Sequence, residues 1–281
     1  MPLTDIFDET LDINSTSDYV LVFQAGYEEL TFTILDAVRN KYIFLRSYTP
    51  DEKIRFSPDE VREIIEKDDF LLKKYRKTFI LSATGLFTMV PASLYDPGKK
   101  DLYFKLNHGN VENHSILNNM IQEADSVLLY GISAPLYENL KSHYPSALFY
   151  HQIKPLFCFM DKEMRKLSGP YLHVNIENDY FCMALFNDYS LRYLNSFPYR
   201  NITDIVYYIL NVIRFSGAGE IQSVHLSGST ERFDELTSLL TLYIKSIRFA
   251  APAGNFSFSY VFNDTELHRY LSLFTAVNCE S

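Results

Sequence analysis

The chain has 281 residues, of which 47% are hydrophobic and 22% are charged, so it can form one large domain or two domains of about 140 residues. A net charge of −9 without a basic stripe disfavours nucleic acid and anionic membrane surfaces, and no apolar run approaches the roughly 18–20 residues of a membrane span. The chain has three cysteines, Cys158, Cys182 and Cys279, and because they are widely spaced and odd in number we expect buried thiols rather than disulfides. The N-terminus is acidic and has no signal-peptide pattern, so we expect a cytoplasmic protein.

The first half is expected to begin with strands. Residues Tyr19 to Tyr48 are rich in β-branched and aromatic side chains, with turn residues at Gly26 and from Asp36 to Asn40, and they predict three strands. The run Ser57-Pro-Asp-Glu60 predicts a helix start, because Ser57 can cap the helix and Glu60 can close a capping box. We expect this helix to end near Tyr75.

Strands and helices then alternate, apart from one stretch. Segment 91–119 contains the turn Asp96-Pro-Gly98 and an Asn/His-rich part, and we expect it to be irregular. The continuous apolar run Ser126 to Tyr130 is typical of a covered parallel strand. The other expected elements are strands at 79–83, 86–90 and 147–150 and helices at 135–143 and 153–167.

The run Ser168-Gly-Pro170 is the best boundary in the chain, and it predicts domains at 1–168 and 169–281. In the second half we expect three strands up to Tyr199, helices at 202–215 and 231–244, and strands at 223–226 and 247–250. Asn263 and Glu266 suggest a capping box for a final helix that ends near Val277. One option is that this last helix packs back on the first domain.

Two stretches of the chain follow the same plan. The first begins at Tyr19 and reaches the turn residue Asp36, and the second begins at Tyr171 and reaches Asp188, 17 positions later in both cases. Each stretch continues into a third apolar run. A repeat of this length predicts two copies of one supersecondary unit, which we interpret as an internal duplication.

This duplicated meander followed by alternating helices and strands resembles the actin-like ATPase fold of actin, sugar kinases and the seventy-kilodalton heat-shock chaperones. The run Val224 to Phe233 resembles the adenosine motif of that superfamily, and Leu86 to Leu94 resembles a strand-Pro segment of its pilus-assembly and cell-division members. The resemblance covers nearly the whole chain and is closest to a bacterial family with a degenerate version of the fold. It implies an α/β protein of two ribonuclease-H-like halves around a nucleotide cleft.

The resemblance also implies where a nucleotide would bind. Each hairpin of the superfamily carries an Asp-x-Gly pattern, in which the Asp handles the metal–phosphate complex and the Gly lets backbone amides approach the phosphate. Here the matching runs are Gln24-Ala-Gly26 and Ile176-Glu-Asn178, and Gly228-Ser229 replaces the Gly-Gly of the adenosine motif. The candidate residues of this degenerate cleft are Gln24, Gly26, Glu177, Asn178, Gly228 and Ser229.

Phosphoryl transfer depends on positioning and on a metal that neutralises charge, so losing these ligands should remove hydrolysis. The sequence thus predicts a non-catalytic, pseudo-ATPase protein without a resident metal or cofactor, which acts as an interaction or scaffold module for a protein partner. A homo-oligomer and residual ATP/Mg²⁺ binding stay open. The alternative is an active ATPase or small-molecule kinase that uses Glu177, Asp179 or Asp188 in place of the lost carboxylates.

Gly131-Ile-Ser-Ala-Pro135 lies between an expected strand and an expected helix, which is the setting of a nucleophile elbow around Ser133. Pro135 stands where such an elbow needs Gly, so a helix N-cap is the simpler role for Ser133.

Overall fold

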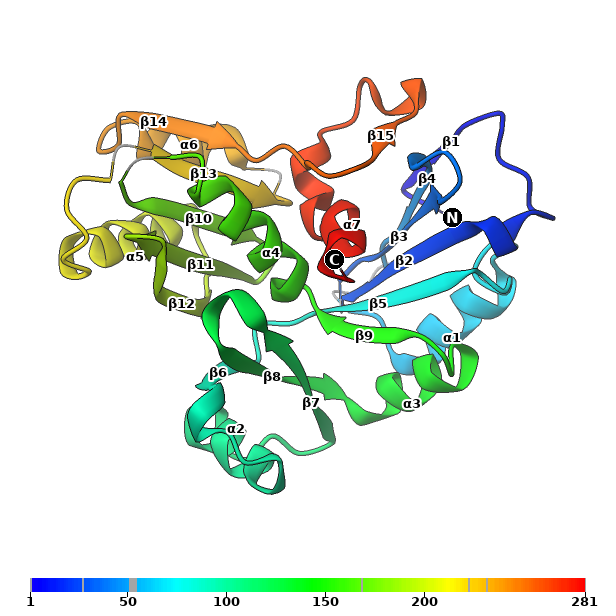
Figure 1. Ribbon diagram of the computed structural model, residues 1–281, viewed down its shortest axis with the longest axis horizontal. Coiled ribbons are helices and arrows are strands. Elements are labelled where there is room, and N and C mark those ends of the chain that lie inside the picture. The colour runs from blue at the N-terminus through cyan, green and yellow to red at the C-terminus, as the bar shows by residue number, and fades with distance from the viewer. Residues whose placement is uncertain are drawn as a thin grey trace.

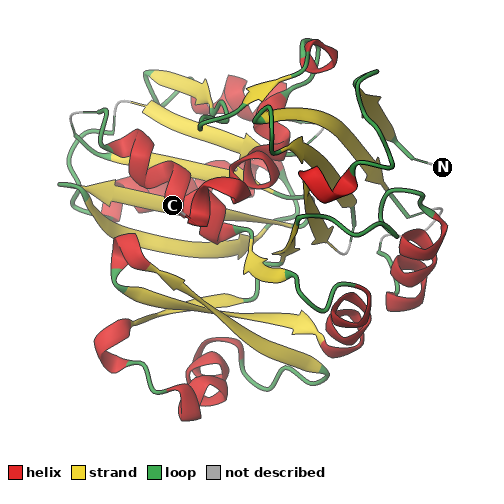
Figure 2. Cartoon of the chain, turned by 45° about the vertical axis from the view of Figure 1, so that its right-hand side comes forward, coloured by secondary structure: helices red, strands yellow, loops and turns green. Residues whose placement is uncertain are grey.

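The computed structural model describes residues 2–26, 28–50, 55–167, 169–221, 223–230 and 232–280. These residues form two large β-sheets, whose faces are covered by helices, and a small sheet that makes a separate lobe beside them (Figures 1 and 2). In the described ranges, no helix combines the length and apolar character that a membrane span needs.

The elements have the following bounds. The first sheet contains, in spatial order, β1 (Thr4–Phe7), β4 (Lys41–Tyr48), β3 (Leu30–Asp36), β2 (Tyr19–Gly26), β5 (Lys77–Ala83) and β9 (Leu148–His151), and β15 (Ser257–Phe258) pairs with β4. The second sheet contains β12 (Ser190–Pro198), β11 (Tyr180–Asn187), β10 (Tyr171–Ile176), β13 (Ser223–Gly228) and β14 (Ser246–Phe249), and the small sheet contains β6 (Phe87–Pro91), β8 (Ser126–Ser133) and β7 (His114–Ile121). The α-helices are α1 (Pro58–Lys67), α2 (Lys100–His108), α3 (Ala134–His143), α4 (Ile153–Met164), α5 (Ile202–Phe215), α6 (Phe233–Leu240) and α7 (Leu271–Thr275), and short 3-10 turns include η6 (Leu267–Tyr270) and η7 (Ala276–Glu280).

The two large sheets repeat one strand plan. Strands β2, β3 and β4 form an antiparallel meander that β5 and β9 extend in parallel, and β10, β11 and β12 form a second meander that β13 and β14 extend in the same way. Each meander has a bulge between its second and third strands, at Ile34/Leu35 and at Leu185/Phe186. Bulges are specific features of a sheet, so their matched positions make the likeness detailed. The predicted fold class, two ribonuclease-H-like halves of mixed sheet with helical cover, is confirmed.

Two helical segments each follow one large sheet in the sequence but pack on the other, and we call them the exchanged segments. Helix α4 follows β9 of the first sheet, but its Leu156, Phe157 and Met160 belong to a core shared by the second sheet and the small sheet. The C-terminal segment follows the second sheet, but Phe262 and Phe274 pack into the first. Helices α4 and α7 therefore meet between the sheets (Figure 1). The apolar residues of each exchanged segment bind the two halves together.

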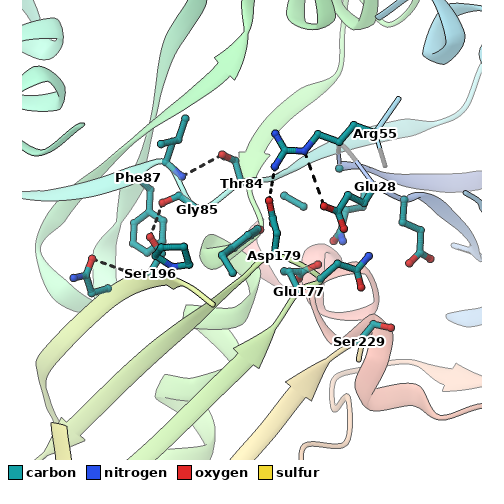
Figure 3. A pocket seen from close by; sticks show the side chains of 18 of the residues that line it. Glu28, Arg55, Thr84, Gly85, Phe87, Glu177, Asp179, Ser196 and Ser229 are labelled. Atoms are coloured by element: carbon teal, nitrogen blue, oxygen red, sulfur yellow. Dashed lines mark hydrogen bonds and ion pairs between the residues drawn. The ribbon is translucent and has the colours of Figure 1, made fainter. Parts of the chain in front are cut away.

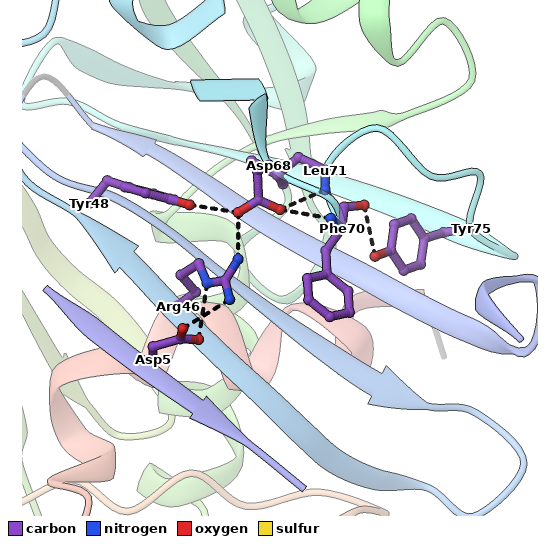
Figure 4. Close-up of polar contacts among 7 residues, drawn as sticks. All are labelled: Asp5, Arg46, Tyr48, Asp68, Phe70, Leu71 and Tyr75. Carbon is purple, nitrogen blue, oxygen red and sulfur yellow. Dashed lines mark hydrogen bonds and ion pairs between the residues drawn. The ribbon is translucent and has the colours of Figure 1, made fainter. Parts of the chain in front are cut away.

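Helix α1 begins where expected, because the Ser57 amide donates to Glu60 Oε2 (2.8 Å) and the Glu60 amide donates to Ser57 Oγ (3.3 Å). It ends at Lys67, two turns before Tyr75. The next residue, Asp68, is buried and accepts hydrogen bonds from the amides of residues 70 and 71, so the chain turns away from the helix axis (Figure 4).

The second oxygen of Asp68 accepts hydrogen bonds from Tyr48 Oη (2.6 Å) and Arg46 Nη1 (2.8 Å), both from β4. Arg46 also binds Asp5 of β1 and lies over the rings of Phe44 and Phe70. These contacts tie the end of α1 to the first sheet (Figure 4).

Segment 91–119 is more regular than the sequence suggested, since it contains α2 and most of β7. The apolar run 126–130 is also not a parallel strand: β8 lies at the centre of the small sheet and is antiparallel to both neighbours. Its side chains alternate between a cluster with Phe104 of α2 and a cluster with α4. Cover on both faces, rather than parallel pairing, explains the continuous apolar run.

The final helix was expected to start at the Asn263/Glu266 capping box, and this was wrong. Asn263 ends a 3-10 turn and Glu266 precedes η6, so the segment is broken into η6, α7 and η7. Helix α6 is also shorter than expected, and its proposed first residue, Glu231, lies outside the described residues, as does Ser168 of the proposed domain boundary. Helix α5 has the expected bounds.

Candidate functional site

A cavity of about 830 Å³ lies between the two large sheets and the small one. The β2–β3 and β10–β11 hairpins, β6, β12 and η6 line it (Figure 3). Of the residues that the sequence singled out, Gln24, Gly26, Glu177, Asn178 and Ser229 line the cavity. The sixth, Gly228, ends β13 behind this lining.

The hairpins correct one part of the sequence alignment. The Gly26 amide donates to Glu29 O (3.1 Å), and the Glu177 amide closes the second hairpin in the same way, on Tyr180 O (2.9 Å). Gly26 therefore corresponds to Glu177, rather than to Asn178, and the earlier match is shifted by one residue.

The same shift moves the metal-ligand position of the second hairpin. Gln24 lies two residues before Gly26, so its counterpart is Asn175 rather than Ile176. The choice of Asp36 and Asp188 as matching positions misled the alignment, because the loop between the second and third strands differs in length. It has four residues after Asp36 in the first half but only two after Asn187 in the second, so Asn187, rather than Asp188, corresponds to Asp36.

Both hairpins thus present a neutral amide where the superfamily has an aspartate. The Gln24 Oε1 accepts a hydrogen bond from Ser272 Oγ of α7 (2.7 Å). Asn175 is buried, and its Nδ2 donates to Glu177 Oε1 (2.9 Å). Neither amide carries the charge that holds a divalent cation in such sites.

Behind Glu177, a hydrogen-bonded chain runs through the second sheet. Ser227 Oγ donates to Asn175 Oδ1 (2.7 Å), so Ser227 accepts from His173 Nε2 (2.8 Å), and His173 Nδ1 accepts from Tyr171 Oη (3.0 Å). Burial, followed by His225, lowers the pKa of His173 to about 3, so the ring is neutral, as this pattern requires. Every donor in the chain points towards the carboxyl group of Glu177.

The cavity is rich in carboxyl groups, which come from Glu28 and Glu29 of the first hairpin and from Glu177 and Asp179 of the second. Burial is the main cause of a raised pKa at Glu28 and Glu29, and the neighbouring Asp179 adds to it at Glu28. Burial, aided by Glu29 and Asp179, raises the pKa of Glu177 to about 8. Negative charge is therefore disfavoured where a phosphate group would have to lie.

Arg55 spans the two hairpins. Its Nη2 lies 2.5 Å from Asp179 Oδ2, and its Nε lies 4.0 Å from Glu28 Oε1 (Figure 3). No sequence pattern points to Arg55, because this residue comes from the segment after β4 and meets the hairpins only in the folded chain.

The backbone at the proposed phosphate and adenosine positions is already engaged. The Ser229 amide donates to Ile176 O (2.8 Å). Gly228 has φ +86°, and a Cβ there would lie 1.9 Å from Ile176 O. Close packing of two strand ends therefore explains this glycine. The turn η6 also packs against β13.

The other candidate positions lie outside the cavity. Asp188 is in the β11–β12 turn, 3.6 Å from Arg192. Ser133 precedes α3 at the N-cap position, and no helix amide donates to its side chain. Among the described residues, no cluster of His, Cys, Asp or Glu has an arrangement that could hold a metal ion.

Comparison with known proteins agrees with this architecture. The family model described as "Protein of unknown function (DUF3822)" matches residues 8–247. A crystal structure of a Bacteroides thetaiotaomicron protein with actin-like ATPase fold and unknown function aligns with a TM-score of 0.79 and 24% identity, and covers 86% of this chain and 94% of that one. No curated protein sequence gives a significant match.

Two more distant structures share the fold. The PilM-PilN type IV pilus biogenesis complex aligns with a TM-score of 0.57 and 11% identity, over 93% of this chain and 98% of that one. The ethanolamine utilization protein EutJ from Carboxydothermus hydrogenoformans aligns with a TM-score of 0.50 and 10% identity, over 97% of this chain and 92% of that one. At these identities the likeness shows the actin-like ATPase fold alone.

Proposed function

The chain belongs to the family described as "Protein of unknown function (DUF3822)", and we propose that it is a non-catalytic actin-like ATPase-fold protein that serves as a protein-interaction or scaffold module. The contact of Arg55 with both hairpins is the main support, because this cation is already engaged by Asp179 and Glu28 and is not left free to pair with the phosphates of a nucleotide. The loss of both metal-ligand aspartates, to Gln24 and Asn175, points the same way.

The energetic argument is electrostatic. Removal of a single preorganised donor costs other enzymes about 3–4 kcal/mol of transition-state stabilisation. Here two ligand positions are neutral, and the position that would need glycine holds Glu177, whose charged form is disfavoured by burial. A triphosphate would meet four carboxyl groups in this cavity, two of which already pair with Arg55, and the described residues provide no ligand set for Mg²⁺.

The cavity itself is the surface that we assign to a partner. A neighbour with the same fold, PilM, has been solved in complex with PilN, so the fold can serve a protein complex. We place this protein in the cytoplasm with a protein partner, with self-association as an option and without nucleic acid. Residues 1–168 and 169–281 would be the two domains left by an ancestral duplication.

Melting temperatures with ATP and Mg²⁺ test the non-catalytic part. A nucleotide at about 100 times its Kd adds about 2.7 kcal/mol to the free energy of unfolding, which raises the Tm of a chain of this size by about 5 °C. We expect no shift at millimolar ATP. A Mg²⁺-dependent rise that Gly26→Val abolishes would contradict the proposal and favour an ATPase or small-molecule kinase acting through Glu177 or Asp179.

A second experiment tests the interaction part. Thr88 of β6 lines the cavity, so Thr88→Arg would fill part of it, whereas the exposed Glu112 lies outside it. We expect Thr88→Arg to lose a co-purifying partner that the wild type and Glu112→Arg retain. Retention by all three proteins would show that the partner site is elsewhere.

A further inference from the structure

The cavity between the sheets follows the edges of two strands, β6 and β12. Each strand contributes three consecutive residues to its lining. These residues are Phe87, Thr88, Met89, Leu194, Asn195 and Ser196, and we call the part of the cavity that they line the edge groove. Successive side chains of a strand point to opposite faces, so a cavity that touches three residues in a row runs along the edge of the strand. Both strands are the outer strands of their sheets.

Strand β12 has unpaired backbone groups at this edge. The Tyr199 amide donates to Asp179 O (3.2 Å), and the register of β11 and β12 then places every second residue, including Asn195, in a hydrogen-bonded pair with β11. The amide and carbonyl groups of Leu194 therefore point away from β11, to the open edge of the second sheet.

Strand β6 has the same arrangement at the edge of the small sheet. The Gly131 amide of β8 donates to Leu86 O (3.0 Å), so Thr88 pairs with β8 and the backbone of Met89 points outwards. In the described part of the chain, no residue forms a hydrogen bond with these outward groups of Met89 and Leu194. Unpaired strand edges of this kind are templates for an additional strand.

The part of the cavity near the hairpins attracts a cation. Four of the described lining residues have a carboxyl group, and two have a guanidinium group. Of these two, Arg269 also pairs with Glu266 outside the cavity (2.6 Å), and Arg55 lies between Glu28 and Asp179. The lining therefore has an excess of negative charge, which favours a basic ligand over an acidic one.

We propose that a partner protein is bound through an extended segment, which adds a strand to the edge of β12 and places a lysine or arginine side chain against the carboxyl groups of Glu28 and Asp179. This inference rests on the proposed function, because it takes the cavity as the partner site and specifies the chemistry of the partner. Main-chain hydrogen bonds to the strand edge would supply affinity, and side chains would supply specificity.

The position of the carboxyl groups determines how the segment is arranged. Strand β12 ends at Pro198, next to the hairpin that carries Asp179, so the basic residue belongs at this end of the segment. Leu194 lies four residues earlier in β12, and it lines the cavity together with Met89. An apolar side chain of the segment would therefore lie about four positions from the basic residue.

The two strands meet at one point of the cavity. Ser196 Oγ donates to Gly85 O (2.5 Å) beside Phe87, and the carboxyl groups of the hairpins lie further along the cavity (Figure 3). A side chain of the bound segment must extend past this contact to reach the carboxyl groups. Lysine and arginine have the long aliphatic stems that this requires.

The first experiment selects a phage-displayed library of random linear peptides on the full chain. We expect enriched peptides to contain a lysine or arginine and an apolar residue about four positions away. The most enriched peptide is then synthesised and N-methylated at one residue at a time. Because only alternate residues of an added strand bond to β12, we expect N-methylation to weaken binding about tenfold at every second position.

Variants of the chain test each contact with the same synthetic peptide. Leu194→Pro removes the outward amide of β12 and should weaken binding about tenfold. Phe7→Pro is the matched control: the neighbouring Asp8 amide donates to Ile43 O (2.8 Å), so the Phe7 amide points outwards from β1, at the edge of the first sheet and outside the cavity lining. We expect Phe7→Pro to bind as the wild type does.

Arg55→Gln gives a result that is specific to a basic ligand. It removes the cation that now pairs with Glu28 and Asp179, so the peptide should bind about threefold to fivefold more tightly. An acidic ligand would bind less tightly to the same variant.

Four results would overturn the inference: no enriched peptide, enriched peptides without a basic residue, an N-methyl series without alternation, or weaker binding to Arg55→Gln. The N-methyl series uses the wild-type chain, so it decides even where Leu194→Pro does not fold. A peptide that Thr88→Arg excludes, but whose N-methyl series does not alternate, would leave the cavity as the partner site and remove only the added strand. A Tm that rises with ATP and Mg²⁺, together with the expected peptide results, would instead remove the non-catalytic function and leave this inference in place.

Discussion

The raised pKa of Glu177 predicts a stability that falls with pH. Burial raises this pKa from 4.5 to about 8, so between these values the folded state holds a proton that the unfolded state has released. The contribution of Glu177 to stability is therefore fully present below pH 4.5, decreases through this window and levels off above pH 8. The full difference corresponds to about 5 kcal/mol, and partial exposure of the side chain reduces it to about 2–3 kcal/mol.

Glu177→Gln removes this titration and retains an oxygen that can accept the hydrogen bond from Asn175. We expect urea unfolding to show little difference between the variant and the wild type at pH 5, and a variant that is about 2–3 kcal/mol more stable at pH 9. Glu112→Gln, at an exposed position outside the cavity, should leave the wild-type profile unchanged. A Glu177→Gln protein that is less stable at pH 9, or a difference that does not vary with pH, would refute the reasoning.

Three further substitutions test the fold by urea or thermal unfolding. An ion pair and hydrogen bonds lower the pKa of Asp8 despite its burial, so its carboxylate stabilises the folded protein above about pH 4, and this contribution is lost in acid. Asp8→Asn should therefore lower the free energy of unfolding by about 3 kcal/mol at pH 7, and the difference between the variant and the wild type should shrink as the pH falls below about 4. Gly228→Ala should lower the free energy of unfolding by more than about 3 kcal/mol, because the new Cβ would overlap Ile176 O. Gly217 also has a positive φ (+65°) but open space around it, so Gly217→Ala should lower the free energy of unfolding by only about 1 kcal/mol. Equal losses in the two variants would contradict the close approach of Gly228 to Ile176. Asp68→Ala removes the acceptor of four hydrogen bonds and should cost about 2–4 kcal/mol, and a loss below 1 kcal/mol would show that the network is dispensable.

The elements that the sequence predicted well are those with local signals. The Ser57/Glu60 capping box forms because its partners are three residues apart, and α5 has the predicted bounds because its apolar period and the Gly217-Ala-Gly219 stop after it are both local. At the end of α1, Asp68 accepts hydrogen bonds from the nearby amides of residues 70 and 71, and Arg46 and Tyr48 of a distant strand hold its second oxygen. The apolar pattern of the helix could not show this second contact.

Strand partners were harder to predict for the same reason. The run 126–130 is apolar because both faces of this strand are covered. The apolar sequence indicates that the strand is buried, but not whether the neighbouring strands are parallel or antiparallel to it. The candidate cleft was located by its hairpins, but Arg55 came to it only through the fold. Pairing across a sheet is a long-range property that no spacing along the chain encodes.

The one-residue shift in the second hairpin changes how the candidate site is understood. Counted from tyrosine and aspartate anchors, the ligand position of the second hairpin appeared to be the apolar Ile176, so the two halves seemed to have lost their carboxylates in different ways. Hydrogen bonding across the hairpins places Asn175 there, opposite Gln24, and puts Glu177 where the first hairpin has Gly26. Both hairpins therefore present an uncharged amide at this position, and both amides bond to the protein itself. Two amides that are already hydrogen-bonded within the protein are what we expect if neither hairpin needs to hold a cation.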